Sequence, residues 1–116
     1  MKNIYYKVLW STIEDFVGLW EILWELNSLL PENSEIENQE IIKGILSFFL
    51  EQQLIIFYSN KWGNKENKEL SFNEALKRLE EKKFWIVPSI NEDCVKISST
   101  EKGEKFYNEE MLDLKI

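Results

Sequence analysis

The sequence predicts one small α+β domain over residues 1–116, with about four helices and a minor, mostly antiparallel sheet. Three segments begin with Ser-x-x-Glu, the capping-box pattern of a helix N-terminus, and continue into runs rich in apolar residues. Short β-branched and aromatic segments lie between the helical ones and are typical of strands. A chain of 116 residues with 44% hydrophobic residues has the size of a single domain with its own core.

The first predicted helix begins at Ser11, with Glu14 completing the capping box, and ends near Leu29 because Pro31 disfavours helical geometry before it. Nearly all of its other residues are large and apolar. We therefore expect the helix to be covered on most sides, either by the core or by a second subunit. Its polar residues recur at steps of four and three and form one narrow stripe: Glu14, Gly18, Glu21, Glu25 and Ser28.

The second predicted helix begins at Ser34, where Glu37 again completes a capping box. Its apolar residues recur at i, i+3, i+4 and i+7 from Ile42 to Phe49, which predicts one buried face. The β-branched and aromatic segment 54–58 follows directly and predicts a strand.

The second half of the chain begins with a polar stretch, 59–70, that is expected to be a loop or a wing. A third capping box opens a helix over 71–82. Candidate strands follow at 84–87, stopped by a proline, and at 94–98, with a turn at 91–93 between them. Thr100 is expected to cap a last helix that runs to about Met111.

This order of elements resembles a winged-helix domain over about residues 36–110. The helix that ends in Leu-Glu-Gln-Gln-Leu-Ile (50–55) and passes into a strand is similar to the passage from recognition helix to wing in that fold. The segment Val-Lys-Ile-Ser-Ser-Thr-Glu-Lys-Gly (95–103) is similar to the strand and "L-T-x-K-G" helix start of many winged-helix regulators. Ser99 replaces the usual Leu, and the helix over 71–82 is extra. More loosely, 16–26 resembles the first helix of small bacterial proteins, some of which neutralise a neighbouring toxin.

The charge of the chain disfavours nucleic acid as a partner. Fourteen Lys and Arg against 21 Asp and Glu give a net charge of −7. Residues 1–60 hold three cations and nine anions, and the expected recognition helix over 35–53 holds one cation and four anions. Binding to DNA needs cations that release counterions from the phosphates, and guanine contacts need Arg or Lys. A membrane partner is not expected either, because no segment approaches the length of an apolar span.

The residues needed for most kinds of catalysis are missing from the sequence. The chain has no His, a single Cys and no Gly-rich phosphate loop, so we expect no enzyme activity, no cofactor and no metal site. Cys94 is interpreted as a small core residue rather than a nucleophile. A cytoplasmic location is expected, since the N-terminal segment lacks the apolar stretch of a signal peptide.

The remaining hypothesis is protein recognition by an acidic surface. A basic protein, such as a nuclease toxin inhibited by an immunity-type protein, is the expected partner, because complementary charge accelerates association. The alternative is a winged-helix regulator that binds DNA as a dimer through the Trp-rich first helix. For Trp62 the alternative to an exposed anchor is packing back onto the sheet. The predicted partner-binding residues are Glu14, Glu21, Glu25, Glu37, Glu40 and Trp62.

Overall fold

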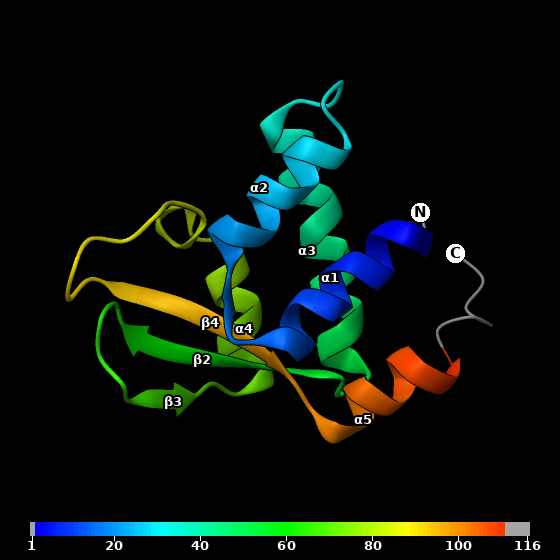
Figure 1. Cartoon of the computed structure of the whole chain (residues 1–116). Helices are drawn as coiled ribbons and strands as arrows, with labels where there is room; N and C mark the ends of the chain where they lie inside the picture. The colour runs from blue at the N-terminus through cyan, green and yellow to red at the C-terminus, as the bar shows by residue number, and fades with distance from the viewer. Residues whose placement is uncertain (1, 111–116) are drawn as a thin grey trace.

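The computed structural model describes residues 2–110 and has an α+β architecture (Figure 1). Its strands form one antiparallel sheet in the order β1-β4-β2-β3. In chain order the elements are α1 (Lys2–Glu14), β1 (Val17–Gly18), α2 (Leu19–Leu29), α3 (Glu35–Glu51), β2 (Ile55–Lys61), β3 (Asn67–Glu69), α4 (Phe72–Leu79), the 3-10 turn η1 (Lys82–Trp85), β4 (Asp93–Ser99), α5 (Glu101–Lys105) and the π-helical turn η2 (Phe106–Glu110).

The helices α2 and α3 run antiparallel and are joined at the top of Figure 1, and α1 crosses in front of α3. The ring of Tyr5 on α1 packs edge-on against Phe48 and Phe49 of α3, with ring centroids 6.1 and 5.8 Å away. Aromatic pairs of this geometry add to the stability that burial supplies. The core lies between these helices and the sheet, where Phe49 and Phe57 are fully buried.

The predicted single helix over residues 11–29 is wrong, because residues 2–29 form two helices, α1 and α2, separated by the short strand β1. Ser11 lies inside α1 and does not cap a helix. Val17 and Gly18 pair with Ile97 and Lys96 of β4, so these backbone groups bond to a distant strand and interrupt the helix. The second helix starts where the Glu21 carboxylate accepts a hydrogen bond from the Gly18 N–H at 3.1 Å.

The other two capping boxes are confirmed. The hydroxyl of Ser34 accepts a hydrogen bond from the Glu37 N–H, and the Glu37 carboxylate accepts one from the Ser34 N–H at 2.8 Å. Ser71 and Glu74 repeat the arrangement at the start of α4. Each box satisfies two N–H groups that the first turn of a helix leaves without a partner. The sequence therefore located the N-termini of α3 and α4.

The predicted strands at 54–58 and 94–98 are confirmed as β2 and β4, which pair from Ile55 with Ser99 to Lys61 with Asp93. The polar stretch 59–70 contains the end of β2 and the short strand β3. The predicted strand at 84–87 is wrong. Phe84 and Trp85 form the turn η1 instead, where the Phe84 N–H donates to the carbonyl of Glu81 at 3.2 Å and the Trp85 indole N–H donates to the carbonyl of Leu79 at 3.0 Å.

The last predicted helix begins as expected. Thr100 accepts a hydrogen bond from the Gly103 N–H at 3.0 Å and caps α5, after which the chain continues as η2. The expected end near Met111 lies outside the described residues. Within residues 2–110, no helix combines the length and the apolar character that crossing a bilayer requires.

Candidate functional site

The packing of α1 on α2 brings an exposed face of α1 beside the acidic exposed face of α2. The Ser11 hydroxyl of α1 lies 3.1 Å from Oε2 of Glu25 on α2, within hydrogen-bonding distance. Trp10 and Glu14 are four residues apart and share an exposed face of α1. On α2, the exposed residues at the same spacings include Glu21 and Trp24. We call the combined area the acidic aromatic surface. Its centre is lined by Tyr6, Lys7, Trp10, Glu25 and Tyr107, and the exposed residues Glu14, Glu21 and Trp24 of the same two helices complete it.

An open depression of about 360 Å³ lies on this surface where α1, α2 and η2 meet. The ring of Tyr107 from η2 lies 5.4 Å from that of Trp10, tilted by 31°, and is nearly perpendicular to the ring of Tyr6 at 5.2 Å. Three aromatic rings therefore meet a carboxylate at one place. The lining residues are Asn3, Tyr6, Lys7, Trp10, Glu25 and Tyr107.

The tryptophans of α2 differ sharply in exposure. Trp20 is only 3% exposed, because its ring lies over Gly18 and meets the edge of Trp62 at 5.4 Å. Trp24, one turn further, is 56% exposed. An exposed Trp on a helix is an unusual use of a large apolar side chain and is typical of a contact with a partner.

Three of the predicted binding residues, Glu14, Glu21 and Glu25, lie on the acidic aromatic surface, although Glu14 belongs to a different helix than expected. The other two carboxylates have separate surroundings. Glu37 is engaged in the cap of α3, where the hydrogen bond that its carboxylate accepts from the Ser34 backbone N–H, followed by that from the Ser34 hydroxyl, holds the pKa of Glu37 below its ordinary value. Glu40 pairs with Lys43 at 3.3 Å, away from the contact between α1 and α2.

The expectation that Trp62 is unusually exposed is wrong, because the residue packs back onto the fold, which was the alternative. Trp62 is half-buried. Its ring is held by Trp20 on one side and has the Lys96 ammonium 5.4 Å from its centroid. Its backbone N–H donates to the carbonyl of Glu92 at 2.9 Å, and its carbonyl accepts from Asn91 at 3.0 Å. These contacts tie the β2–β3 hairpin to the loop before β4.

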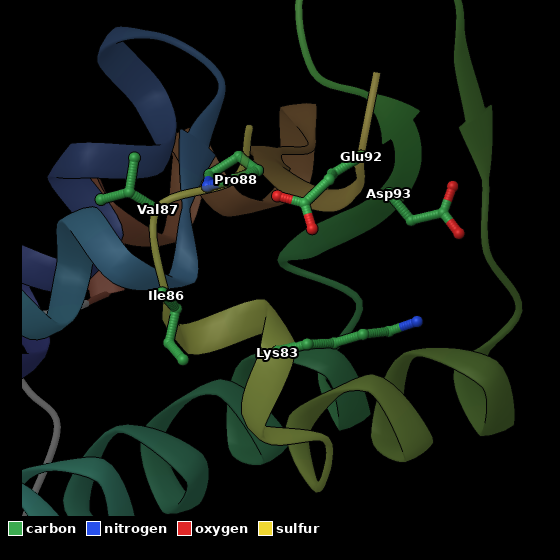
Figure 2. Close-up of a pocket in the computed structure, with 6 residues that line it drawn as sticks. All are labelled: Lys83, Ile86, Val87, Pro88, Glu92 and Asp93. Carbon is green, nitrogen blue, oxygen red and sulfur yellow. The ribbon is translucent and has the colours of Figure 1, made fainter. Parts of the chain in front are cut away.

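A second depression, of about 300 Å³, lies beside that loop (Figure 2). Ile86, Val87 and Pro88 line one side, the Glu92 carboxylate points toward them, the Asp93 carboxylate points away from them, and Lys83 lies below. The Lys61 ammonium, 2.8 Å from Oδ1 of Asp93, holds the pKa of that carboxyl below its ordinary value. With Asp93 paired in this way, Lys83 and Glu92 offset each other. This depression also lacks the aromatic side chains that line the first one.

Within the described residues 2–110, no group of three or more carboxylates or thiols is placed to hold a metal ion. The thiol of Cys94 is buried, and burial raises its pKa above the ordinary value. The interpretation of Cys94 as a core residue is thus confirmed by its position in β4. A comparison with protein-family models, curated proteins and solved structures finds no match to the chain.

The predicted partner-binding residues omit the aromatic part of this surface, namely Tyr6, Trp10, Trp24 and Tyr107. The placement of the first helix at Ser11 left the preceding ten residues without an assigned element. A signal was present, since Lys7, Trp10 and Glu14 recur at steps of three and four and predict a common helix face. No pattern in the sequence predicts that Tyr107 lies beside Trp10, because the two residues are far apart along the chain.

Proposed function

We propose that the chain is a non-enzymatic protein-binding module whose acidic aromatic surface binds a basic protein. The observation that carries this proposal is the presence of two exposed tryptophans, Trp10 and Trp24, among three carboxylates on two helices packed against each other. Buried Trp side chains supply most of the binding energy in many interfaces, and surrounding charges steer the encounter. Because the helices already fix the backbone of these residues, binding has to order only their side chains.

Charge selects the class of partner. Glu14, Glu21 and Glu25 outnumber Lys7, the cation that lines the depression, so the surface favours a positively charged protein. A second copy of the chain is a poorer occupant, since a two-fold axis would place the same carboxylates opposite one another. Nucleases carry cationic sites for phosphate. An immunity-type inhibitor of a nuclease toxin therefore accounts for both the charge and the aromatic anchors.

As part of this proposal, we infer that the chain has a winged-helix-like fold. The passage from α3 through Gln52 and Gln53 into β2, the return of β4 antiparallel to β2, and the Thr100 cap of α5 support it. Two parts depart from it: α4 and η1 are inserted between β3 and β4.

The alternative function, DNA binding by a winged-helix dimer, is opposed by the charges of α3. Its one cation, Lys43, lies 3.3 Å from Glu40 and 3.4 Å from Glu80. The Lys43 ammonium is therefore already paired with carboxylates and is not free to bind a phosphate. The Coulomb repulsion between the acidic exposed face of α3 and a phosphate backbone disfavours docking in a groove. The positive side chains of the second half are interleaved with carboxylates, as the pairing of Lys61 with Asp93 illustrates.

The proposal is tested by capturing partners with the tagged chain from a lysate of its own host. The variant Glu14→Lys/Glu25→Lys is compared with the control Glu51→Lys/Glu66→Lys, and both change the net charge of −7 by the same amount. All four carboxylates are exposed, so neither variant disturbs the core. We expect a protein with a pI above about 8 that is retained by the unaltered chain and the control and lost by the first variant.

The captured protein is then purified and its association rate measured by stopped-flow fluorescence. We expect the rate to fall about tenfold between low and physiological salt, and to lose this dependence in the Glu14→Lys/Glu25→Lys variant. Equal rates for the two double variants, or a partner of acidic pI, would contradict the proposal. Salt-sensitive retention of the unaltered chain on heparin would favour the DNA-binding alternative instead.

A further inference from the structure

We infer that the depression between Tyr6, Trp10, Tyr107 and Glu25 receives an arginine side chain of the basic partner. This inference rests on the proposed function for the origin of the arginine, but the site itself is defined by the chain's own residues. The depression is open to solvent, has a volume of about 360 Å³, and has room for one guanidinium and its apolar stem. It is the place where aromatic faces and a carboxylate converge on the acidic aromatic surface.

The aromatic rings form the attractive part of the site for a cation. Trp10 is 44% exposed even though one side of its ring lies 5.4 Å from Tyr107, so part of the indole remains open to solvent. Tyr6 stands nearly perpendicular to Tyr107 and also lines the depression. The face of an aromatic ring carries negative electrostatic potential, and Trp attracts a cation most strongly.

Glu25 supplies the full negative charge. Its Oε2 lies 3.1 Å from the Ser11 hydroxyl, which is also 2.8 Å from the Lys7 carbonyl, so the side chain is oriented against α1. No hydrogen bond from another described residue occupies Oε1 of Glu25. This oxygen is free to accept an N–H from a ligand. A single charged group of the ligand can therefore lie over the Trp10 ring and donate a hydrogen bond to Glu25 at the same time.

Arginine fits these requirements better than lysine. The guanidinium is planar, stacks on an aromatic face and presents several N–H donors in its own plane, whereas an ammonium is compact and more strongly hydrated. The resident cation, Lys7, lines the same depression and takes part in no ion pair among the described residues. Lys7 therefore competes with an incoming cation, and removing its charge should strengthen binding.

The test uses two blocked peptides of equal charge, acetyl-Arg-Gly-Arg-Gly-Arg-Gly-amide and its lysine counterpart. Binding is followed by the NMR signal of the Trp10 indole N–H, assigned with Trp10→Phe. The indole of Trp85 donates to the carbonyl of Leu79 at 3.0 Å in the core and serves as an internal reference. We expect the arginine peptide to move the Trp10 signal, leave the Trp85 signal in place, and bind at least threefold more tightly than the lysine peptide.

Three variants define the chemistry of the site. Glu25→Gln, which keeps an acceptor for Ser11, should weaken binding of the arginine peptide about fivefold. Lys7→Met should strengthen it about twofold. The control Glu66→Gln removes the same charge at an exposed position outside the depression and should leave the dissociation constant within about twofold.

Equal affinity for both peptides would overturn the assignment to arginine, and tighter binding to Glu25→Gln or weaker binding to Lys7→Met would overturn the assignment to a cation. These outcomes are separate from those of the capture experiment, because the peptides need no partner. If the arginine peptide binds as expected and no basic protein is captured, the site stands and the proposed function fails. If a basic protein is captured and the peptide leaves Trp10 unchanged, the function stands and this site fails.

Discussion

Gly103 lies where α5 meets the backbone at the start of β2, and its replacement by Ala provides a sharp test of this junction. A Cβ atom at this position would lie 2.1 Å from the carbonyl oxygen of Leu54 and 3.0 Å from its carbon. That carbonyl also accepts a hydrogen bond from the Thr100 N–H at 2.9 Å. Because the obstructing atom belongs to the backbone, it cannot rotate away. Gly103→Ala therefore has to displace α5 from β2.

The expected loss follows from three effects on the free energy of unfolding. Overpacking a closely packed site costs about 1–3 kcal/mol. Lengthening or breaking the hydrogen bond between Thr100 and Leu54 costs about 1 kcal/mol more. Ala favours a helix over Gly by about 1 kcal/mol, which offsets part of the loss. We expect Gly103→Ala to lower the free energy of unfolding by about 2 kcal/mol.

The same substitution at Gly44 is the control. Gly44 lies within α3, and a Cβ atom there would meet nothing within 4 Å. Only the helix preference remains, so Gly44→Ala should raise the free energy of unfolding by about 0.5–1 kcal/mol. Both variants are measured by urea unfolding, followed through the fluorescence of buried tryptophans. The midpoint should fall by about 1 M for Gly103→Ala and rise slightly for Gly44→Ala.

A Gly103→Ala variant as stable as the unaltered chain would refute the close approach of α5 to Leu54. A drop in stability of equal size at Gly44 would show that the loss does not come from the junction. The comparison also explains the Thr-x-x-Gly pattern at 100–103 in physical terms. The Thr hydroxyl accepts from the Gly N–H, and the missing side chain lets the helix start lie against the backbone.

Two further predictions concern titratable groups. Hydrogen bonds from Ser34 lower the pKa of Glu37 in the folded chain, so the ionised Glu37 stabilises the fold above pH 4.5, and this contribution is lost as the pH falls through the lowered pKa. We therefore expect Glu37→Gln to reduce the fall of the urea midpoint between pH 6 and pH 3. Burial of Cys94 should keep its thiol unreactive, so a disulfide reagent at pH 8 should label it at the rate of unfolding; labelling that is fast compared with unfolding would contradict its place in the core.

The sequence predicted those elements whose signals are local. The capping boxes at Ser34 and Ser71 were sufficient to place α3 and α4, because a Ser-x-x-Glu pattern satisfies the helix N-terminus by itself. The same pattern at Ser11 was misleading, since that residue lies inside α1 and the true interruption occurs at β1. Pairing of Val17 with Ile97 decides this break, and the partner strand lies 80 residues further along the chain.

For the candidate site, the sequence alone determined the sign of the charge, the lack of the usual catalytic groups and the three carboxylates Glu14, Glu21 and Glu25. Only the tertiary structure decided which aromatic side chains accompany them. Trp62 from a distant hairpin lies against Trp20 and both lose exposure, whereas Tyr107 leaves part of Trp10 open to solvent. The physical reason is that exposure depends on neighbours supplied by other segments, while charge and helix capping are set by the residues themselves.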